Sequence, residues 1–216
     1  MKTPAPNKRP QDAELLRAMA TFDIPAMRAA LAAGANANLR MDDAGRTPLM
    51  HMAGLSWYDR ISAVHLLLEC GADVHLADRQ GRTALHVAAA SPVWKSEEVL
   101  RALLDAGADI DAADAGGNRP LHLAVRCWVK DEQPFVLLAL LERGADLQAR
   151  NRKGKTPPDI AIDSREMPEG KQKMREMFNR YAEKQAARRE ALQQRKQQER
   201  ALLRAKSKNP GLKLKK

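Results

Sequence analysis

The sequence predicts an all-α solenoid, in which pairs of helices stack one on the next, followed by a basic helix at the C-terminus. Three observations lead to this prediction. A segment of about 36 residues recurs along the chain, aromatic residues make up only 4% of a sequence rich in Ala and Leu, and the positive charge is concentrated near the C-terminus. Recurrence of a short unit indicates stacking, because one such unit cannot bury its apolar side alone.

The first marker of the repeat is a turn followed by the start of a helix. The segments DDAGRTPLMHMA, DRQGRTALHVAA, DAGGNRPLHLAV and NRKGKTPPDIAI begin at Asp42, Asp78, Asp114 and Asn151, at intervals of 36, 36 and 37 residues. The Asp-x-x-Gly pattern is typical of a tight turn. A Thr hydroxyl then accepts a hydrogen bond from a helical N–H, and Pro suits the first helical position because it lacks only a donor that would stay unpaired. Each segment therefore predicts a turn and a first helix.

The second marker is the end of a second helix. Apolar runs such as AVHLLLECG end at Gly34, Gly71, Gly107 and Gly144, at intervals of 37, 36 and 37 residues. Glycine ends helices because it adopts the left-handed conformation without steric cost. The predicted unit is turn, helix, turn, helix.

These segments resemble the ankyrin repeat, whose signature is T-P-L-H-x-A. The resemblance covers residues 12–164 and implies about five units after a disordered N-terminus at 1–11, namely 12–41, 42–77, 78–113, 114–150 and 151–164. It also implies β-hairpin fingers at the Asp-x-x-Gly turns and a concave face that binds other proteins. In the family the motif Thr and His join neighbouring repeats by hydrogen bonds. That role would belong here to Thr83 with His86, and in part to His122.

Three departures from the signature bear on this expectation. Met50 occupies the His position of its unit and His51 an apolar one, so the bond after the first finger is expected to be weakened or replaced. The first unit has two predicted helices and no finger, which suits an N-terminal cap. Pro158 and Asp159 occupy the Leu and His positions of the last unit, whose outer face needs no further neighbour.

The fingers supply one set of candidate partner-binding residues. In the resembled family such side chains contact the partner, and their mixed charge here leaves the partner's own charge open. The alternative interpretation is that they are ordinary solvated turn residues. The candidates are Asp43, Arg46, Arg79, Gln80, Arg82 and Asn118.

The three tryptophans of the sequence form a second set. Trp57, Trp94 and Trp128 lie in the turns expected between the two helices of a unit, so stacking would align them along one edge. Trp is frequent at binding hot spots, but it also covers helix ends well, and we favour the second interpretation. Acidic residues after each Trp are expected in the first turn of the second helix, where they suit the helix dipole: Asp59, Glu97, Glu98, Asp131 and Glu132.

The charge separates the C-terminal part of the chain from the rest. Residues 164–216 contain 17 Lys and Arg against 6 Asp and Glu, whereas the preceding 163 residues contain 20 against 21. Residues 165–182 keep an apolar stripe and are expected to cap the last repeat as a helix. The stripe fades in 183–216, which predicts a basic tail, helical or disordered.

Two interpretations of the tail are favoured equally: a solvated helix without a ligand, and weak binding of nucleic acid or another polyanion. Its apolar side is too thin for a membrane-surface helix, and heptad positions do not persist for a coiled coil. The candidate polyanion-binding residues are Arg188, Arg189, Arg195, Lys196, Arg200 and Arg204.

The remaining patterns narrow the class of protein. No run reaches the roughly 18 apolar residues of a membrane span and no export signal is recognised, so we expect a cytoplasmic protein. Phosphate-binding, zinc-protease and hydrolase motifs are missing, and Cys70 and Cys127 read as free thiols. We expect a monomeric, non-catalytic protein-binding scaffold or adaptor without cofactor or metal. The alternative is a nucleic-acid or ribosome-associated protein that uses the basic tail.

Overall fold

A computed structural model describes residues 9–55, 60–91, 96–131, 135–163 and 170–208, and these residues form helices and turns without any strand. The chain divides into two compact units, Met1–Lys171 and Gln172–Lys216. Each unit is described by itself below. The all-α prediction is confirmed, whereas the β-hairpin form of the fingers is not.

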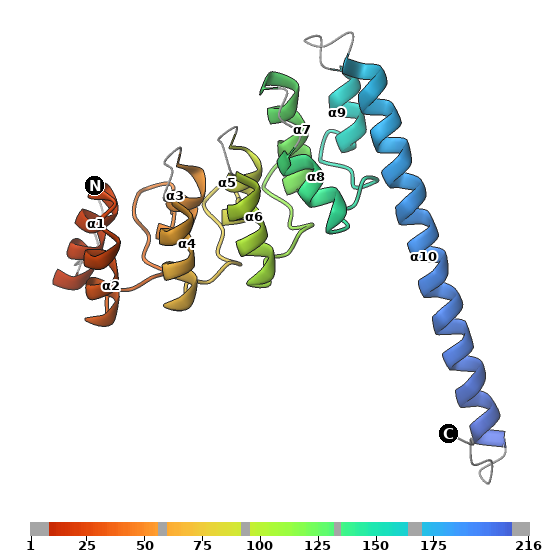
Figure 1. Cartoon of the computed structure of the whole chain (residues 1–216), viewed down its shortest axis with the longest axis horizontal. Coiled ribbons are helices and arrows are strands. Elements are labelled where there is room, and N and C mark those ends of the chain that lie inside the picture. Colours follow the sequence, from red (N-terminus) through yellow and green to blue (C-terminus); the bar gives the residue numbers. More distant parts are fainter. Residues whose placement is uncertain (1–8, 56–59, 92–95, 132–134, 164–169, 209–216) are drawn as a thin grey trace. The chain divides into compact units, whose positions relative to one another are not determined.

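The described part of the compact unit Met1–Lys171 contains nine helices, arranged as successive pairs (Figure 1). The back row (α2, α4, α6 and α8) and the front row (α3, α5, α7 and α9) each run in chain order, neighbour against neighbour, and α1 packs against α2. Their bounds are α1 Pro10–Thr21, α2 Ile24–Ala32, α3 Pro48–Gly54, α4 Arg60–Glu69, α5 Ala84–Ala89, α6 Ser96–Asp105, α7 Pro120–Asp131, α8 Phe135–Glu142 and α9 Pro157–Asp163.

The front-row helices begin where the repeated motif predicts. The helices α3, α7 and α9 start at the Pro of the motif, and Thr47 accepts a hydrogen bond on its hydroxyl from the N–H of Met50 at 3.3 Å. Most front-row helices have only six or seven residues. Helices this short are unstable alone in water, so packing against their neighbours must hold them.

The back-row helices end at the predicted glycines. Gly34, Gly71, Gly107 and Gly144 have φ angles of 91°, 82°, 91° and 91°, in the left-handed region. The N–H of the residue that follows each glycine donates back into the helix, as from Ala72 to the Leu67 carbonyl at 2.9 Å. This arrangement satisfies a carbonyl that the helix end would otherwise leave unpaired.

The core of the first unit repeats with the sequence. Leu49, Leu85 and Leu121 occupy the same motif position in successive units, and their side chains are 1%, 0% and 0% exposed. Small residues near the ends of the front-row helices, such as Ala53 and Ala89, are fully buried and let neighbouring helices approach closely. Stacking therefore builds one continuous core.

The turn between the helices of the third finger-bearing unit is shorter than predicted. Trp128 and Asp131, which were expected in that turn and at the start of the second helix, both belong to α7, and Asp131 is its last residue. The prediction was wrong because nothing in the segment after Cys127 breaks a helix before Pro134. Glu97 and Glu98 do lie in the first turn of α6, as predicted.

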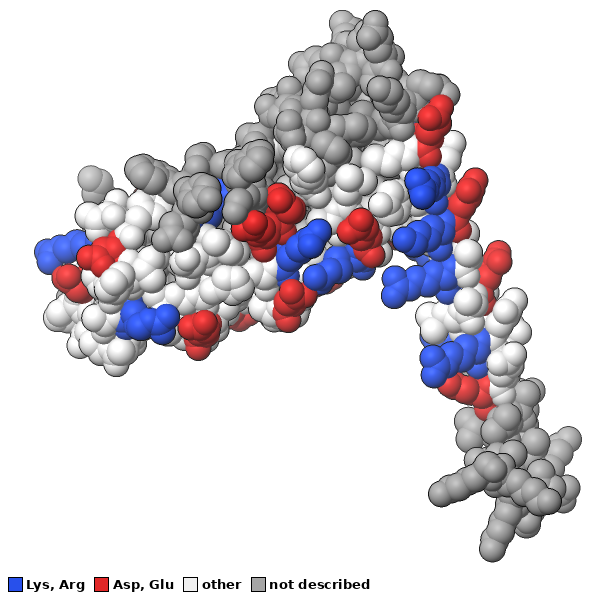
Figure 2. Space-filling view, in the orientation of Figure 1, with Lys and Arg blue, Asp and Glu red and all other residues white. Residues whose placement is uncertain are grey.

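The second unit is built on one long helix, α10, which spans Gly170–Lys208 and ends directly before Asn209 and Pro210. From Glu183 to Glu199 every side chain except Gln185 is exposed, and Leu192 is 52% exposed. Lys and Arg are prominent on the described part of this helix (Figure 2). The prediction that residues 165–182 cap the last repeat stays a prediction.

None of the helices in the described ranges is long and apolar enough to cross a membrane.

Candidate partner-binding surface

Four tight turns, called fingers 1 to 4, precede the front-row helices: residues 42–46, 78–82, 114–118 and 151–155. Finger 2 shows how they are built. The N–H of Asp78 donates to the carbonyl of Arg82 and the N–H of Gly81 to that of Asp78, both at 2.9 Å. One carboxylate oxygen of Asp78 also accepts from the N–H groups of Gln80 and Arg82 at 2.8 and 2.9 Å. Asp78 thus stabilises the turn by hydrogen bonds to its backbone.

Each finger is tied to the next by one backbone hydrogen bond. The N–H of Arg79 donates to Ala44 at 2.9 Å, that of Ala115 to Gln80 at 2.8 Å, and that of Arg152 to Gly116 at 3.0 Å. These bonds set the distance between neighbouring fingers. The side chains of Arg79, Gln80 and Arg152 are exposed even though their backbone is held in place. Asp43, at the tip of finger 1, is exposed as well.

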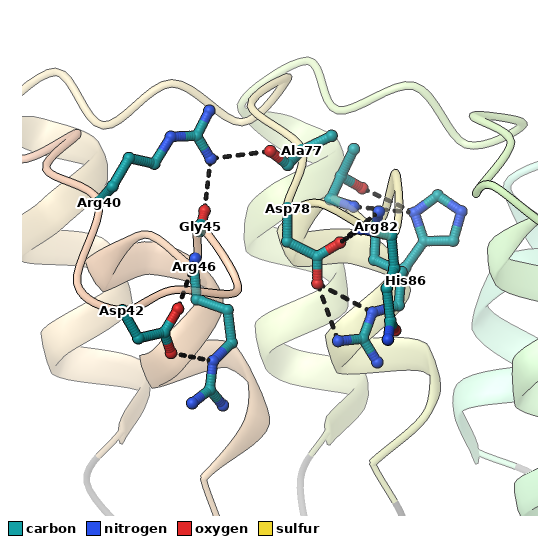
Figure 3. Close-up of polar contacts among 10 residues, drawn as sticks. Arg40, Asp42, Gly45, Arg46, Ala77, Asp78, Arg82 and His86 are labelled. Carbon is teal, nitrogen blue, oxygen red and sulfur yellow. Dashed lines mark hydrogen bonds and ion pairs between the residues drawn. The ribbon is translucent and has the colours of Figure 1, made fainter. Parts of the chain in front are cut away.

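Two of the predicted binding residues also support the turns. The Arg46 Nε donates to Asp42 at 2.6 Å, and Arg82 donates through Nε and Nη2 to Asp78 at 2.9 and 2.8 Å (Figure 3). Burial of Asp78 would raise its pKa, but the N–H and guanidinium of Arg82 outweigh burial and the pKa of Asp78 is lowered. Asp78 is therefore a buried ionised carboxylate matched by an arginine that is 36% exposed.

Asn118 also stabilises the fold through its side chain. Its amide nitrogen donates to the carboxylate of Asp114 at 3.1 Å, and its amide oxygen accepts from the Asn151 side chain at 2.9 Å. The side chain is half-buried between fingers 3 and 4. Of the predicted finger residues, Asn118 is thus the one whose polar atoms are most fully used inside the fold.

The motif histidines join neighbouring units, as the resemblance implied. His86 accepts at Nδ1 from the N–H of Thr83 at 3.2 Å, so Nε2 carries the proton and donates to the carbonyl of Asn118 at 3.1 Å. His122 repeats the pattern with the N–H of Arg119 and the carbonyl of Lys155, both at 3.1 Å. Both rings are fully buried, and burial lowers the pKa of each.

Among the finger-bearing units, the first and the last have another residue in place of the motif histidine, and for the first of them a weakened or replaced bond was predicted. The Met50 side chain has no N–H to offer, and Arg40 instead links finger 1 to the residue before finger 2 by donating from Nη1 to the carbonyls of Gly45 and Ala77 at 2.5 and 2.8 Å (Figure 3). In the last unit, the Asp159 carboxylate accepts from the N–H of Thr156 at 2.9 Å and closes the start of α9.

The front row carries a stripe of side chains that was not among the predicted site residues. His51, Val87, Leu123 and Ile160 are all half-exposed and recur at 36, 36 and 37 residues. They occupy the variable position x of T-P-L-H-x-A, which for Val87 and Leu123 is the one residue between the buried His and the buried Ala. The signal was therefore present in the sequence, as the variable position of the motif. Burial, and then the charge of Arg46, lower the pKa of His51.

Between α3 and α5 the front row is hollowed into a groove of about 400 Å³, the α3–α5 groove. Gly54 and Ala90, which line it near the ends of the two helices, have almost no side chain, whereas the next unit, 114–150, has Arg126 at this position. A Cβ added at Gly54 would lie 2.7 Å from Val87 Cγ1. The groove therefore exists because two successive units carry small residues there.

The remaining predicted residues are placed as follows. Trp57 and Trp94 lie outside the described residues, as does the side chain of Trp128, so the tryptophan row stays a prediction. The described tail candidates all have exposed side chains on α10: Arg188, Arg189, Arg195 and Lys196. Arg200 and Arg204 belong to the same helix, with side chains outside the described residues.

The repeated part of the chain is similar to known proteins. A family model described as ankyrin repeats (3 copies) matches residues 15–114 and 55–151. A stretch of 48 residues is 52% identical to Inversin from Gallus gallus, covering 22% of this chain and 4% of that protein. The chain thus spans a small fraction of the relative it matches, and the similarity concerns the repeats.

Proposed function

The chain belongs to the ankyrin repeat family, and from that premise we propose that it is a non-catalytic scaffold or adaptor that holds a partner protein on its fingers and front row. Ankyrin repeats generally mediate protein–protein interaction and are typically not enzymes. In this proposal the front row corresponds to the concave face that the family uses.

One observation carries this proposal: the finger row combines a fixed backbone with exposed side chains. Arg79, Gln80 and Arg152 use their backbone groups to join the fingers, and their side chains are exposed. Side chains on a rigid row at constant spacing lose little conformational freedom when they bind, and preorganisation of this kind favours affinity. Tight turns at the protein surface are also where binding residues are most frequent.

The fingers can be tested by affinity capture with the full chain. We expect a partner captured by the wild type to be lost with the triple variant Arg79→Ala, Gln80→Ala and Arg152→Ala. The matched control is Arg101→Ala, which removes an exposed arginine from α6 on the back row. Retention of the partner by the triple variant, with circular dichroism unchanged, would contradict binding through the fingers.

The basic tail supports a second candidate function, association with nucleic acid or with ribosomes. It is supported by the exposed arginines and lysines of α10, which are spaced along a helix with few acidic residues. Binding of this kind depends steeply on salt because it releases counterions from the phosphates.

The tail can be tested separately from the fingers. Fluorescence anisotropy with a labelled single-stranded RNA should show binding at about 50 mM salt that weakens by at least about tenfold at 200 mM, and none after deletion of residues 183–216. RNA binding that survives the deletion would contradict this candidate. A partner protein captured through the fingers should be retained by the same deletion.

A further inference from the structure

We propose that the α3–α5 groove binds a segment of the partner protein in which a carboxylate side chain stands next to an apolar one. The inference rests on the proposed function, because it adds the chemistry of the partner to a surface on the same front row. Three parts of the groove carry it: two guanidinium groups at the finger end, an apolar middle, and a buried hydroxyl near the far ends of the helices.

The finger end of the groove is positively charged. Arg46 and Arg82 line the groove, whereas the carboxylates that pair with them, Asp42 and Asp78, are not among its lining residues. Figure 3 shows the two guanidinium groups on the same side of the finger row. The guanidinium of Arg46 uses only Nε for Asp42, and that of Arg82 uses Nε and Nη2 for Asp78, so in the described part of the chain their other guanidinium N–H groups have no partner.

These groups suit a single negative charge. The two carboxylates that pair with the arginines already offset much of their charge. A carboxylate, which accepts two N–H bonds in a plane, matches such guanidinium edges. A phosphate dianion would call for more uncompensated positive charge than the groove offers.

Away from the arginines, the groove has an apolar wall beside the half-exposed His51. Val87 and Leu55 are half-exposed lining residues, and Gly54 and Ala90, near the helix ends, add almost no side chain. An apolar side chain of a partner would remove their surface from water, which is favourable in proportion to the area covered. These apolar residues and the two guanidinium groups line the same groove of about 400 Å³. Neighbouring residues of one bound segment can therefore reach both.

The far end holds a polar atom that no described residue satisfies. Ser91 is 7% exposed, and among the described residues its hydroxyl has no hydrogen-bond partner. Buried hydroxyl groups are almost always paired in native proteins. Ser91 lines the groove, so a backbone amide or carbonyl of the bound segment can supply the missing partner.

The experiment uses displayed octapeptides and the full chain as bait. One library has Glu beside Leu at its centre, in both orders and with random flanks, and the matched libraries replace Glu by Gln or by phosphoserine. We expect enrichment from the Glu library at least about tenfold above the Gln library, because Gln keeps the shape and removes the charge. Equal enrichment from the Gln library, or stronger enrichment from the phosphoserine library, would overturn the proposal.

Variants of the groove then locate the binding site of a selected peptide, with fluorescence anisotropy as the measurement. Ala90→Glu and Ala90→Gln fill the groove equally, at an exposed position that follows α5. Ala90→Glu should raise the Kd at least about tenfold more than Ala90→Gln does, because it sets a like charge against the peptide carboxylate. Ala106→Glu, the same change at an exposed alanine outside the groove, should leave the Kd unchanged.

Failure of this proposal can be told from failure of the proposed function. A selected peptide whose Kd is the same with Ala90→Glu as with Ala106→Glu overturns the groove as its site. If that peptide is instead lost with Arg79→Ala and Gln80→Ala, the fingers bind it and the scaffold function stands. Arg46→Gln gives a further check, since loss of one guanidinium should weaken the Glu peptide several-fold and leave any Gln peptide unaffected.

Discussion

The junction between fingers 1 and 2 differs from the two junctions that follow it. All three share a backbone hydrogen bond between neighbouring fingers. The later two add a buried histidine, His86 or His122, that bonds to the next unit, whereas the first adds the exposed guanidinium of Arg40. The comparison teaches that one repeat can keep its geometry while exchanging a buried polar bond for an exposed one.

The exchange also changes the front row. Met50 fills the buried position that histidine holds elsewhere, and His51 lies one residue further on, half-exposed in the α3–α5 groove. The first junction therefore has fewer hydrogen bonds in its interior and more polar side chains on its surface. We interpret it as the junction suited to binding and the later two as those suited to stability; three predictions address this difference, and a fourth concerns the tail.

The largest expected effect comes from one substitution made at both kinds of junction. His86→Leu should lower the free energy of unfolding by about 2–3 kcal/mol, because it leaves the buried N–H of Thr83 without a partner and removes one of the two hydrogen bonds to the Asn118 carbonyl, which keeps only the one from the Asp114 N–H. Met50→Leu, which conserves volume and removes no polar group, should cost less than about 1.5 kcal/mol. Urea unfolding followed by circular dichroism measures both, and equal losses would contradict the contrast.

The second prediction concerns pH. The pKa values of His86 and His122 are lowered by burial, so the unfolded chain takes up protons on these residues before the folded chain does. The contribution of these histidines to the free energy of unfolding is complete above the unfolded pKa of about 6.5. It is lost as the pH falls below that value, with a slope of up to about 1.4 kcal/mol per pH unit for each histidine.

Urea unfolding at pH 7.5 and 5.5 measures this dependence. The wild type should be less stable at pH 5.5, and the double variant His86→Gln, His122→Gln should lose less between the two pH values, although it starts from a lower stability. The same pH dependence in both proteins would show that the junction histidines are not its source.

The third prediction tests the exposed bridge at the first junction. Arg40→Gln should lower the free energy of unfolding by about 1 kcal/mol, since it removes hydrogen bonds that solvent can partly replace. Arg101→Gln on the back row is a matched control with an exposed side chain. A loss as large as that of His86→Leu would mean that the first junction depends on Arg40 as strongly as the others depend on histidine.

The smallest effect is expected from the tail. Deletion of residues 183–216 should change the free energy of unfolding by less than about 0.5 kcal/mol, because the described side chains from Glu183 onward are almost all exposed. Urea unfolding of the shortened chain, followed by circular dichroism, gives the comparison. A larger loss would show that the tail takes part in the folded structure.

Much of the fold could be predicted from the sequence because its determinants are local. The starts of α3, α7 and α9 follow from a Pro after the turn, and the ends of the back-row helices from a glycine at constant spacing. The role of His86 followed from the motif. The connection after α7 was predicted wrongly, because the segment through Trp128 has no residue that compels a helix to end.

The site was less predictable because it depends on what neighbouring units leave uncovered. Asp43, Arg79 and Gln80 were correctly expected to be exposed, since they follow a turn residue directly. Asn118 was expected to face a partner, but most of its hydrogen-bonding capacity is used within the fold. The half-exposed stripe that includes Val87 was missed, because exposure of an apolar residue depends on how far the adjacent helix covers it.

The sequence by itself determined the repeat, its period, the boundaries of most helices and the separation of a neutral array from a basic tail. These follow from backbone preferences and from charge, which act over a few residues. Only the tertiary structure decided that Arg40 replaces a histidine, that Gly54 and Ala90 open a groove, and that this groove is lined by the Ser91 hydroxyl, which has no partner among the described residues. Those features arise between residues some 36 positions apart, and stacking alone sets which of their atoms meet.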